Sequence, residues 1–142
     1  MEISEVRQRL RQTIDRARRR AAERRGRADA AGRQYEEFLS RVVTPVFRMM
    51  AMALKAEGHP FAMTTPQGRA RLVSERDPSD FLEVELDVSG PSPRAMGRAV
   101  HTIGRRVTTV ERPIREGAEI ADLTEEDLLQ FLLTEIEAFV ER

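Results

Sequence analysis

The sequence predicts an α+β protein. A long N-terminal amphipathic helix, kinked or broken near Pro45, is expected to lead into a four- to five-stranded antiparallel meander sheet with a C-terminal helix packed on it. Three observations predict this class. Apolar residues follow a helical period from Ile3 to Val42, the period changes to two after Pro60, and a helix start signal stands at Thr124.

The chain is expected to divide into a coiled-coil-like helical arm over residues 1–43 and a small α+β domain over residues 44–142. A length of 142 residues suits one domain with an appended arm. The elements expected in the second part are a helix over 45–57, strands over about 60–65, 69–76, 81–88, 94–103 and 106–114, and a helix over 124–141.

The N-terminal segment carries one narrow apolar stripe at helical spacing. At about 100° per residue, its apolar side chains fall within an arc of roughly 120° for about eleven turns. A helix of about 42 residues is roughly 60 Å long, which is more than a small domain covers with its own surface. We therefore expect a second copy of the helix to cover the stripe. The residues expected to mediate this self-association are Ile3, Val6, Leu10, Ile14, Ala17, Ala21, Ala28, Ala31, Tyr35 and Phe38.

The middle of the stripe limits the strength of such pairing. Between Ala17 and Ala31 its members are alanines with Arg24 among them, so each turn buries little apolar area. Gly26 and Gly32 each cost about 1 kcal/mol relative to alanine in a helix. We expect the centre of this helix to be its least stable part.

The Thr44-Pro45 pair is expected to end or kink the first helix. Proline lacks an N–H and disfavours helical backbone in the residue before it. The same pair suits the start of a second helix, with Thr44 as the N-cap, Pro45 in the first turn and Gly58 after the last. The sequence leaves open whether this second helix is a bent continuation of the first or sets off in a new direction.

The period of two is clearest from Phe81 to Val88, where leucine and valine alternate with acidic residues. The acids Glu83, Glu85 and Asp87 are expected to share one face, opposite the apolar side chains. An antiparallel sheet with one buried and one solvated face has this pattern. A last hairpin is expected to turn near Gly104-Arg105.

The C-terminal helix has the best-marked start in the chain. Thr124 is expected to cap it with Asp127 at N3, close to a capping box, and Leu123 and Leu128 form a hydrophobic staple. The apolar arc of this helix is wider than one sheet face requires, so part of it is expected to meet the segment from 46 to 54 or a partner chain. The residues of the arc are Leu128, Leu129, Leu132, Leu133, Ile136, Phe139 and Val140.

Methionine is concentrated in one part of the chain. Four methionines occur from Met49 to Met63. Flexible thioether side chains suit an adaptable docking groove, and they equally suit the packing of a core. The sequence favours the core.

Charge is balanced overall but divided between the ends of the chain. Residues 5–33 hold eleven arginines and four acids, a surplus of seven positive charges, whereas residues 116–142 hold nine acids and one arginine, a surplus of eight negative charges. The two ends are therefore expected to attract each other within a chain or between chains.

Cysteine is absent, which excludes disulfides and thiolate metal sites. No apolar run approaches the length of a membrane span, so a cytoplasmic location without membrane association is expected.

The chemistry-bearing residues point to no catalytic, cofactor or metal site. His59 and His101 are the only histidines, and nothing in their spacing brings them together beside a carboxylate. The acids that surround one predicted hairpin follow no calcium-loop spacing, and phosphate-loop, dinucleotide, zinc-protease and nucleophile-elbow motifs do not occur. We expect a protein that is not an enzyme.

The arginine-rich segment from residue 7 to 33 supports a second hypothesis. A basic helical arm neutralises nucleic-acid phosphates without any sequence-reading motif. Against this, the arginines project all around the helix, and acids are interspersed among them. Only one of the 24 basic residues is a lysine, and the GC-rich coding sequence that this indicates raises the arginine content of the whole chain. A solvated helix is the favoured interpretation. The residues of a possible nucleic-acid contact are Arg18, Arg19, Arg20, Arg24 and Arg25.

The expected function is a non-catalytic protein–protein interaction or assembly module. The arrangement looks like that of small bacterial adaptor or assembly proteins, which is an analogy of fold alone. A homo-oligomer, with a dimer as the first guess, would form through the N-terminal helix, and the sheet domain would face a further protein partner. The alternative is a nucleic-acid-binding protein that uses residues 7–33.

Overall fold

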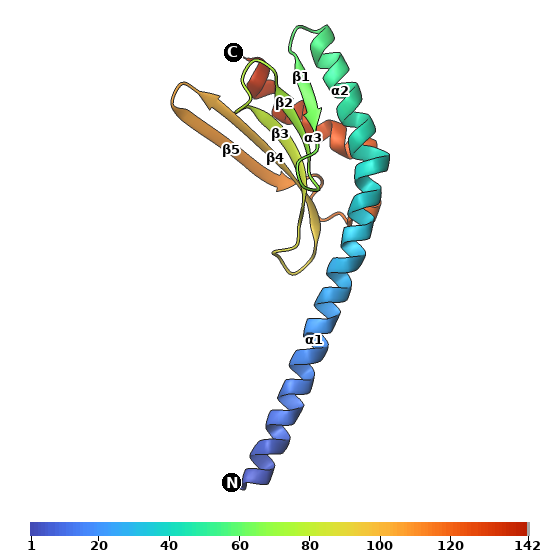
Figure 1. Cartoon of the computed structure of the whole chain (residues 1–142), viewed down its shortest axis with the longest axis vertical. Helices are drawn as coiled ribbons and strands as arrows, with labels where there is room; N and C mark the ends of the chain where they lie inside the picture. The colour runs from blue at the N-terminus through green and yellow to red at the C-terminus, as the bar shows by residue number, and fades with distance from the viewer. Residues whose placement is uncertain (142) are drawn as a thin grey trace.

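The computed structural model describes residues 1–141, and its architecture is a long helix to which a small sheet domain is attached (Figure 1). Three helical segments run without interruption at the start of the chain: α1 (Ile3–Phe38), a π-helical turn η1 (Leu39–Val43) and α2 (Thr44–Ala56). The remaining elements are β1 (Phe61–Thr64), β2 (Ala70–Ser74), β3 (Phe81–Asp87), β4 (Arg94–Ile103), β5 (Arg106–Pro113), the short 3-10 helix η2 (Ile120–Asp122) and α3 (Glu125–Val140).

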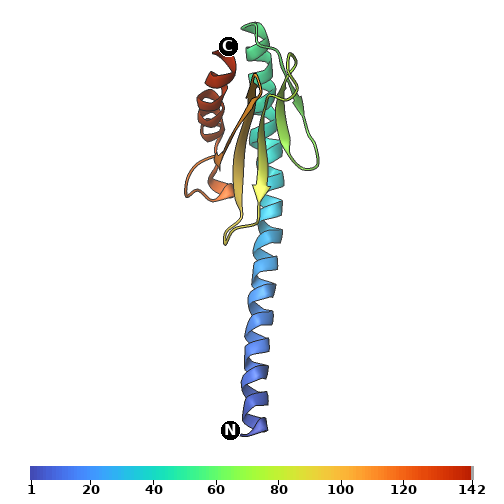
Figure 2. The same ribbon diagram turned by 90° about the vertical axis from the view of Figure 1, so that its left-hand side faces the viewer.

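The α+β class predicted from the sequence is confirmed. The five strands form one antiparallel meander in the order β1-β2-β3-β4-β5, so each strand pairs with its neighbours in the chain. The last hairpin turns at the predicted place, because Ile103 pairs with Arg106 and Gly104 takes the positive φ of 61°. The helices α2 and α3 lie on one side of the sheet, as the two perpendicular views show (Figures 1 and 2).

The sequence predicted a kink or break near Pro45, and the structure does not show it. Val43 and Thr44 both have right-handed helical backbone angles, so Thr44 is a helical residue rather than an N-cap. The main-chain N–H of Thr44 donates to the carbonyl of Leu39, five residues back, which is the π-helical bond. This wider turn comes directly before Pro45, where a proline ring would otherwise crowd the carbonyl of the preceding turn.

The π-helical turn also sets which side chains of α2 face the domain. It holds one residue more than an α-helical turn, so it rotates everything after it by about 100° relative to a regular α-helix. In a regular α-helix, Met49 would lie near the side of Val42, seven residues before it, and Met50 would lie about 80° away. In the structure Met50 is buried and Met49 is 52% exposed. The extra residue thereby keeps the buried residues of α2 on the same side as those of α1.

The core lies between the sheet and the helices α2 and α3. Leu72, Leu82 and Val84 of the sheet are fully buried, as is Phe47 of α2, while Phe131 of α3 is almost so. A Cβ atom built on Gly97 of β4 would lie well inside van der Waals contact of the Phe131 ring. Glycine at this position therefore lets the aromatic ring pack directly on the strand.

The opposite face of the sheet differs from the expectation of a wholly solvated acidic face. Glu83 is 0% exposed. Its carboxylate pairs with Arg71, whose Nε donates to Oε2 at 2.7 Å, and it has Arg69 and Arg98 within 3.6 and 3.9 Å. The Arg71 guanidinium also lies 4.0 Å from the ring centroid of Phe81. The arginine side chains around the carboxylate, one of them packed on Phe81, account for its burial on the face without helices.

The start of α3 confirms the predicted capping box. The Thr124 hydroxyl oxygen accepts from the main-chain N–H of Asp127 at 3.2 Å, and the Thr124 N–H donates to the Asp127 carboxylate at 2.9 Å. These two bonds satisfy donors that the first turn of a helix leaves unpaired.

Candidate functional site

The arm is the part of the long helix that extends beyond the domain, and we define it as residues 3–30. It stands free of the sheet and of α3 in both perpendicular views (Figures 1 and 2). Its large apolar side chains are Ile3, Val6, Leu10 and Ile14, with exposed fractions of 78, 45, 56 and 39%. Their spacing of three or four residues places them on one side of the helix. The free end of the arm thus presents a continuous apolar ridge to solvent.

The same stripe continues into the core of the domain. Ala31, Tyr35 and Phe38 are buried. The Tyr35 hydroxyl donates to the main-chain carbonyl of Val84 at 3.0 Å, and burial, aided by the charges of Glu85 and Glu83, raises the pKa of this hydroxyl. Three of the ten residues predicted for self-association therefore contribute to the core of their own chain.

Between the exposed ridge and the buried end lie the alanines of the stripe. Ala17 is exposed, and Ala21 and Ala28 are partly exposed. Ile14, Ala21, Ala28 and Tyr35 follow at intervals of seven residues, a spacing that keeps them near one side of a helix with a drift of only about 20° per step. The exposed ridge thus points to roughly the side of the helix on which the domain is attached.

Few side-chain contacts hold the arm itself. Arg9 pairs with Glu5 at 3.0 Å, and the Thr13 hydroxyl donates to the carbonyl of Arg9 at 3.0 Å. Both contacts are local and exposed, and exposed pairs four residues apart contribute only about 0.3–0.5 kcal/mol. The arm therefore gains little stability from its own surface.

The arginines of the alternative hypothesis all lie on this arm. Each of them is exposed. Among the ion pairs formed by residues 1–141, none includes any member of this set, so their charges are not compensated by a carboxylate within ion-pair distance. The set is Arg18, Arg19, Arg20, Arg24 and Arg25.

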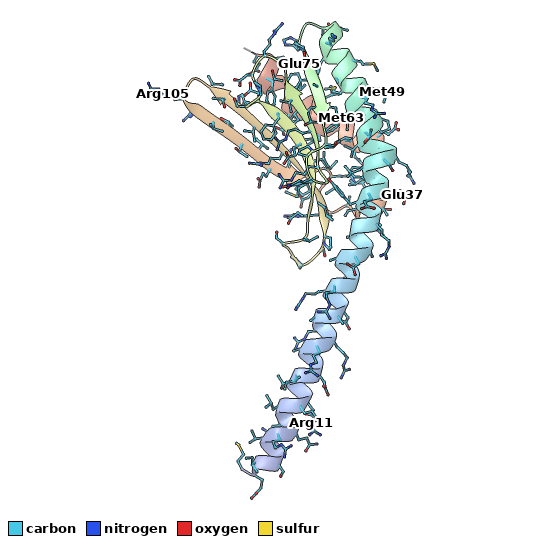
Figure 3. The ribbon with its side chains drawn as sticks, viewed as in Figure 1. Arg11, Glu37, Met49, Met63, Glu75 and Arg105 are labelled. Carbon is cyan, nitrogen blue, oxygen red and sulfur yellow. The ribbon has the colours of Figure 1, made fainter. Side chains whose placement is uncertain are left out.

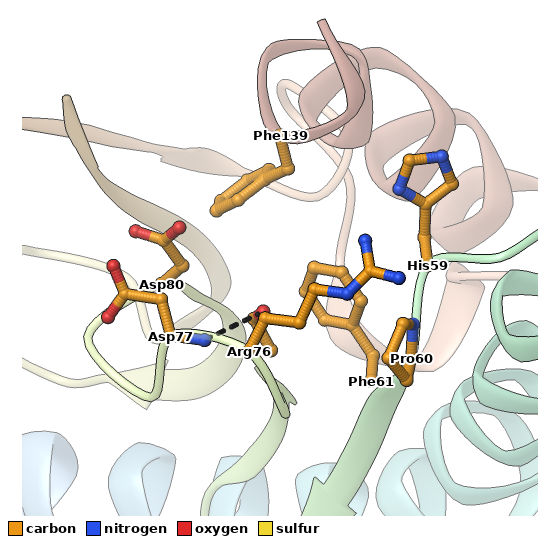
Figure 4. A pocket seen from close by; sticks show the side chains of 8 residues that line it. His59, Pro60, Phe61, Arg76, Asp77, Asp80 and Phe139 are labelled. Carbon is orange, nitrogen blue, oxygen red and sulfur yellow. Dashed lines mark hydrogen bonds between the residues drawn. The ribbon is translucent and has the colours of Figure 1, made fainter. Parts of the chain in front are cut away.

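His59 lines a small hollow of about 170 Å³ together with Asp77 and Asp80 (Figure 4). Asp77 accepts hydrogen bonds from the main-chain N–H and the hydroxyl of Ser79 at 3.1 and 2.6 Å, and Asp80 accepts from the N–H of Thr102 at 2.8 Å. The carboxylates therefore hold the turn between β2 and β3. Figure 4 shows them on the opposite side of the hollow from the imidazole, with the Arg76 side chain between, so we assign no acid–base chemistry to it.

The second histidine lies on the helix-covered face of the sheet. The His101 ring packs against Phe139 of α3, with 5.4 Å between ring centroids. Phe139 also lines the hollow beside His59. The two histidines thus lie near the same phenylalanine, and the ring of His101 packs against it.

Sequence reasoning missed the arginine cluster around Glu83. The pattern that identifies this cluster is a row of alternating charges across four strands. In the strand register Arg71 lies opposite Glu83, Glu83 opposite Arg98, and Arg98 opposite Glu111. Opposite charges directly across neighbouring strands stabilise a sheet. The row becomes visible only once the strand register is known.

Comparisons of this chain with models of protein families, with curated proteins and with solved structures find no match. Within residues 1–141, no helix combines the length and the hydrophobicity needed to cross a bilayer, and no three potential metal ligands of the His, Cys, Asp and Glu types come together.

Proposed function

We propose that this protein is a non-catalytic interaction module that self-associates through the apolar ridge of its arm, here defined as Ile3, Val6, Leu10 and Ile14. The observation that carries the proposal is the alignment of these four exposed side chains on a helix that projects from its own domain. Contiguous exposed apolar surface of this kind is typical of protein–protein interaction sites.

The energetics agree with this assignment. Covering an aliphatic side chain of this size contributes about 1.5–3 kcal/mol when burial is complete. Four such side chains on one ridge are enough to offset the loss of translational and rotational freedom in a weak to moderate association. The alanine segment adds little area, so we expect the free end of the arm to dominate the binding energy.

Light scattering and sedimentation velocity on the full-length chain test the proposal. The variant Leu10→Glu/Ile14→Glu places two charges on the ridge, and we expect it to lose the multimer that the unaltered chain forms. The matched control is Gln8→Glu/Gln12→Glu, which makes two substitutions at the same spacing on the other side of the same helix. Equal molar masses for all three proteins would reject the ridge as the association surface.

A second candidate function rests on the uncompensated arginines of the arm. Five exposed guanidinium groups without a carboxylate within ion-pair distance are suited to nucleic-acid phosphates. On this alternative, duplex DNA or RNA binds with an affinity that falls steeply with salt. Replacing Arg18, Arg19, Arg20, Arg24 and Arg25 by Gln is then expected to abolish binding in a fluorescence anisotropy titration. Absence of binding at low salt would remove this alternative and leave self-association untouched.

A further inference from the structure

A groove between the helices α2 and α3 forms a second apolar surface of the domain. Its volume is about 300 Å³. Met49 of α2 and Leu129 of α3 line it, together with Glu125 and Glu126 where α3 begins. Leu133 follows Leu129 one turn later on α3 and is 49% exposed. The groove thus combines an apolar floor with an acidic end.

The acidic end of the groove is open to a cationic partner. Glu125 and Glu126 are exposed, and neither takes part in an ion pair among residues 1–141. Glu126 accepts only a neutral hydrogen bond from the Gln130 amide, at 3.0 Å. Nine acids and no base occur from residue 116 to 141. The two glutamates therefore favour positive charge at this end of the groove.

The arm has the apolar ridge and the positive charge that complement the groove. Its apolar ridge repeats at three- and four-residue intervals, as helices that bind in apolar grooves do. Arg7 and Arg11 stand next to Val6 and Leu10, and residues 5–33 carry a surplus of seven positive charges. The ridge from Ile3 to Ile14 spans about 17 Å at 1.5 Å per residue.

Charge also argues against the simplest alternative, the pairing of one arm with another. Arg7 and Arg11 flank the ridge on one side, and Arg18, Arg20 and Arg24 follow it along the arm. Two arms paired in parallel would bring their positive surpluses together, and antiparallel pairing of the ridges would bring Arg7 of one copy near Arg11 of the other. Like charges at an interface cost free energy, whereas docking of the arm in the acidic groove brings opposite charges together.

A chain cannot place its arm in its own groove. The arm and α2 belong to one continuous helix, and Figure 3 shows Arg11 on the arm and Met49 on α2 in widely separated parts of it. We propose that the arm of one copy docks in the α2/α3 groove of a second copy, a proposal that rests on self-association through the ridge. Reciprocal exchange of arms closes a dimer, and one-way docking extends a chain of copies.

Complementation between two full-length variants tests this proposal. The arm variant is Leu10→Glu/Ile14→Glu, and the groove variant is Met49→Lys/Leu129→Lys, which replaces two apolar side chains that line the groove and reverses its charge preference. We expect each variant alone to sediment as a single chain, because each lacks one half of the contact. Mixing the two is expected to restore a complex, since the intact arm of the groove variant meets the intact groove of the arm variant.

Controls separate the two proposals. Met52→Lys/Val107→Lys alters two exposed apolar residues that do not line the groove, and we expect this variant to associate like the unaltered chain. Thermal unfolding followed by circular dichroism checks that all variants are folded. If the groove variant associates normally while the arm variant does not, the ridge functions but this groove is not its partner. If the arm variant also associates normally, both proposals are overturned.

Salt provides an independent readout. Docking of the basic arm in the acidic groove is expected to weaken several-fold as salt rises from low to physiological concentration, because screening reduces the attraction. Pairing of two basic arms would instead tighten with salt. A molar mass that increases with salt would therefore overturn the docking proposal.

Discussion

The Tyr35 hydroxyl lies 3.0 Å from the main-chain carbonyl of Val84 and donates a hydrogen bond to it. This bond joins the long helix to β3, the middle strand of the sheet, from a side chain that is 4% exposed. It lies one turn beyond the end of the arm, because the stripe is buried from Ala31 onward and exposed at the free end.

Replacement of Tyr35 by Phe tests this connection. The substitution leaves the carbonyl of Val84 without this donor inside the core, so we expect the free energy of unfolding to fall by about 1–2 kcal/mol. Urea unfolding followed by circular dichroism measures the change. A loss below about 0.3 kcal/mol would show that the bond does not hold the helix on the sheet.

The raised pKa of Tyr35 predicts a pH dependence of stability. The unfolded chain releases the tyrosine proton near pH 10, while the folded chain retains it to higher pH. Stability is therefore unaffected by this group below about pH 10 and falls above it, by up to about 1.4 kcal/mol per pH unit. Tyr35 is the only tyrosine, so tyrosinate absorbance reports on it alone. We expect Tyr35→Phe to remove this part of the alkaline loss.

Gly97 is predicted to tolerate no side chain. A methyl group there would overlap the Phe131 ring, and overpacking of this kind costs about 1–3 kcal/mol. Gly97→Ala is therefore expected to lower the unfolding midpoint in urea, and a second substitution, Phe131→Leu, to recover part of the loss. Gly90→Ala is the matched control, since a Cβ at Gly90 meets no atom within 4 Å. Equal stability of the two alanine variants would contradict the close packing.

Glu83 is predicted to matter more for stability than its neighbour Glu85. Glu83→Gln removes the buried charge that compensates Arg71 and Arg98, and we expect a loss of about 1–3 kcal/mol, because water still reaches parts of both arginines. Glu85→Gln removes a partly exposed pair with Arg69 and is expected to cost less than about 1 kcal/mol. Urea unfolding of both variants gives the comparison. A smaller loss for Glu83→Gln would show that its ion pairs add no net stability.

The phase of the long helix can be tested by deleting single residues. Removal of Ser40, an exposed residue of η1, takes away the extra residue of the π-helical turn. The buried faces of α1 and α2 then differ by about 100°, and we expect a loss of at least about 3 kcal/mol, comparable to emptying a core position.

Deletion of Gln12 is the matched control for this experiment. It removes one residue from the arm, where no part of the domain is packed, so the unfolding midpoint of the domain is expected to stay unchanged. Similar losses for the two deletions would mean that the π-helical turn is not what aligns the two buried faces.

Local patterns in the sequence were sufficient to predict most of the fold. Alternating residues predicted the position of β3, Gly104 the last hairpin, and Thr124 with Asp127 the start of α3. Each of these features depends on interactions between residues only a few positions apart, which a single sequence displays directly.

By itself, then, the sequence determined the elements of this protein, their order and the apolar stripe of its arm. Only the tertiary structure decided that Pro45 lies within an unbroken helix, that Met50 rather than Met49 is buried, and that Glu83 is covered by arginines. It also decided that the stripe passes from the core to exposed surface at Ala31. The physical reason is that burial depends on what packs against a side chain. Those partners lie far away in the sequence, or on a strand whose register cannot be predicted from neighbouring residues.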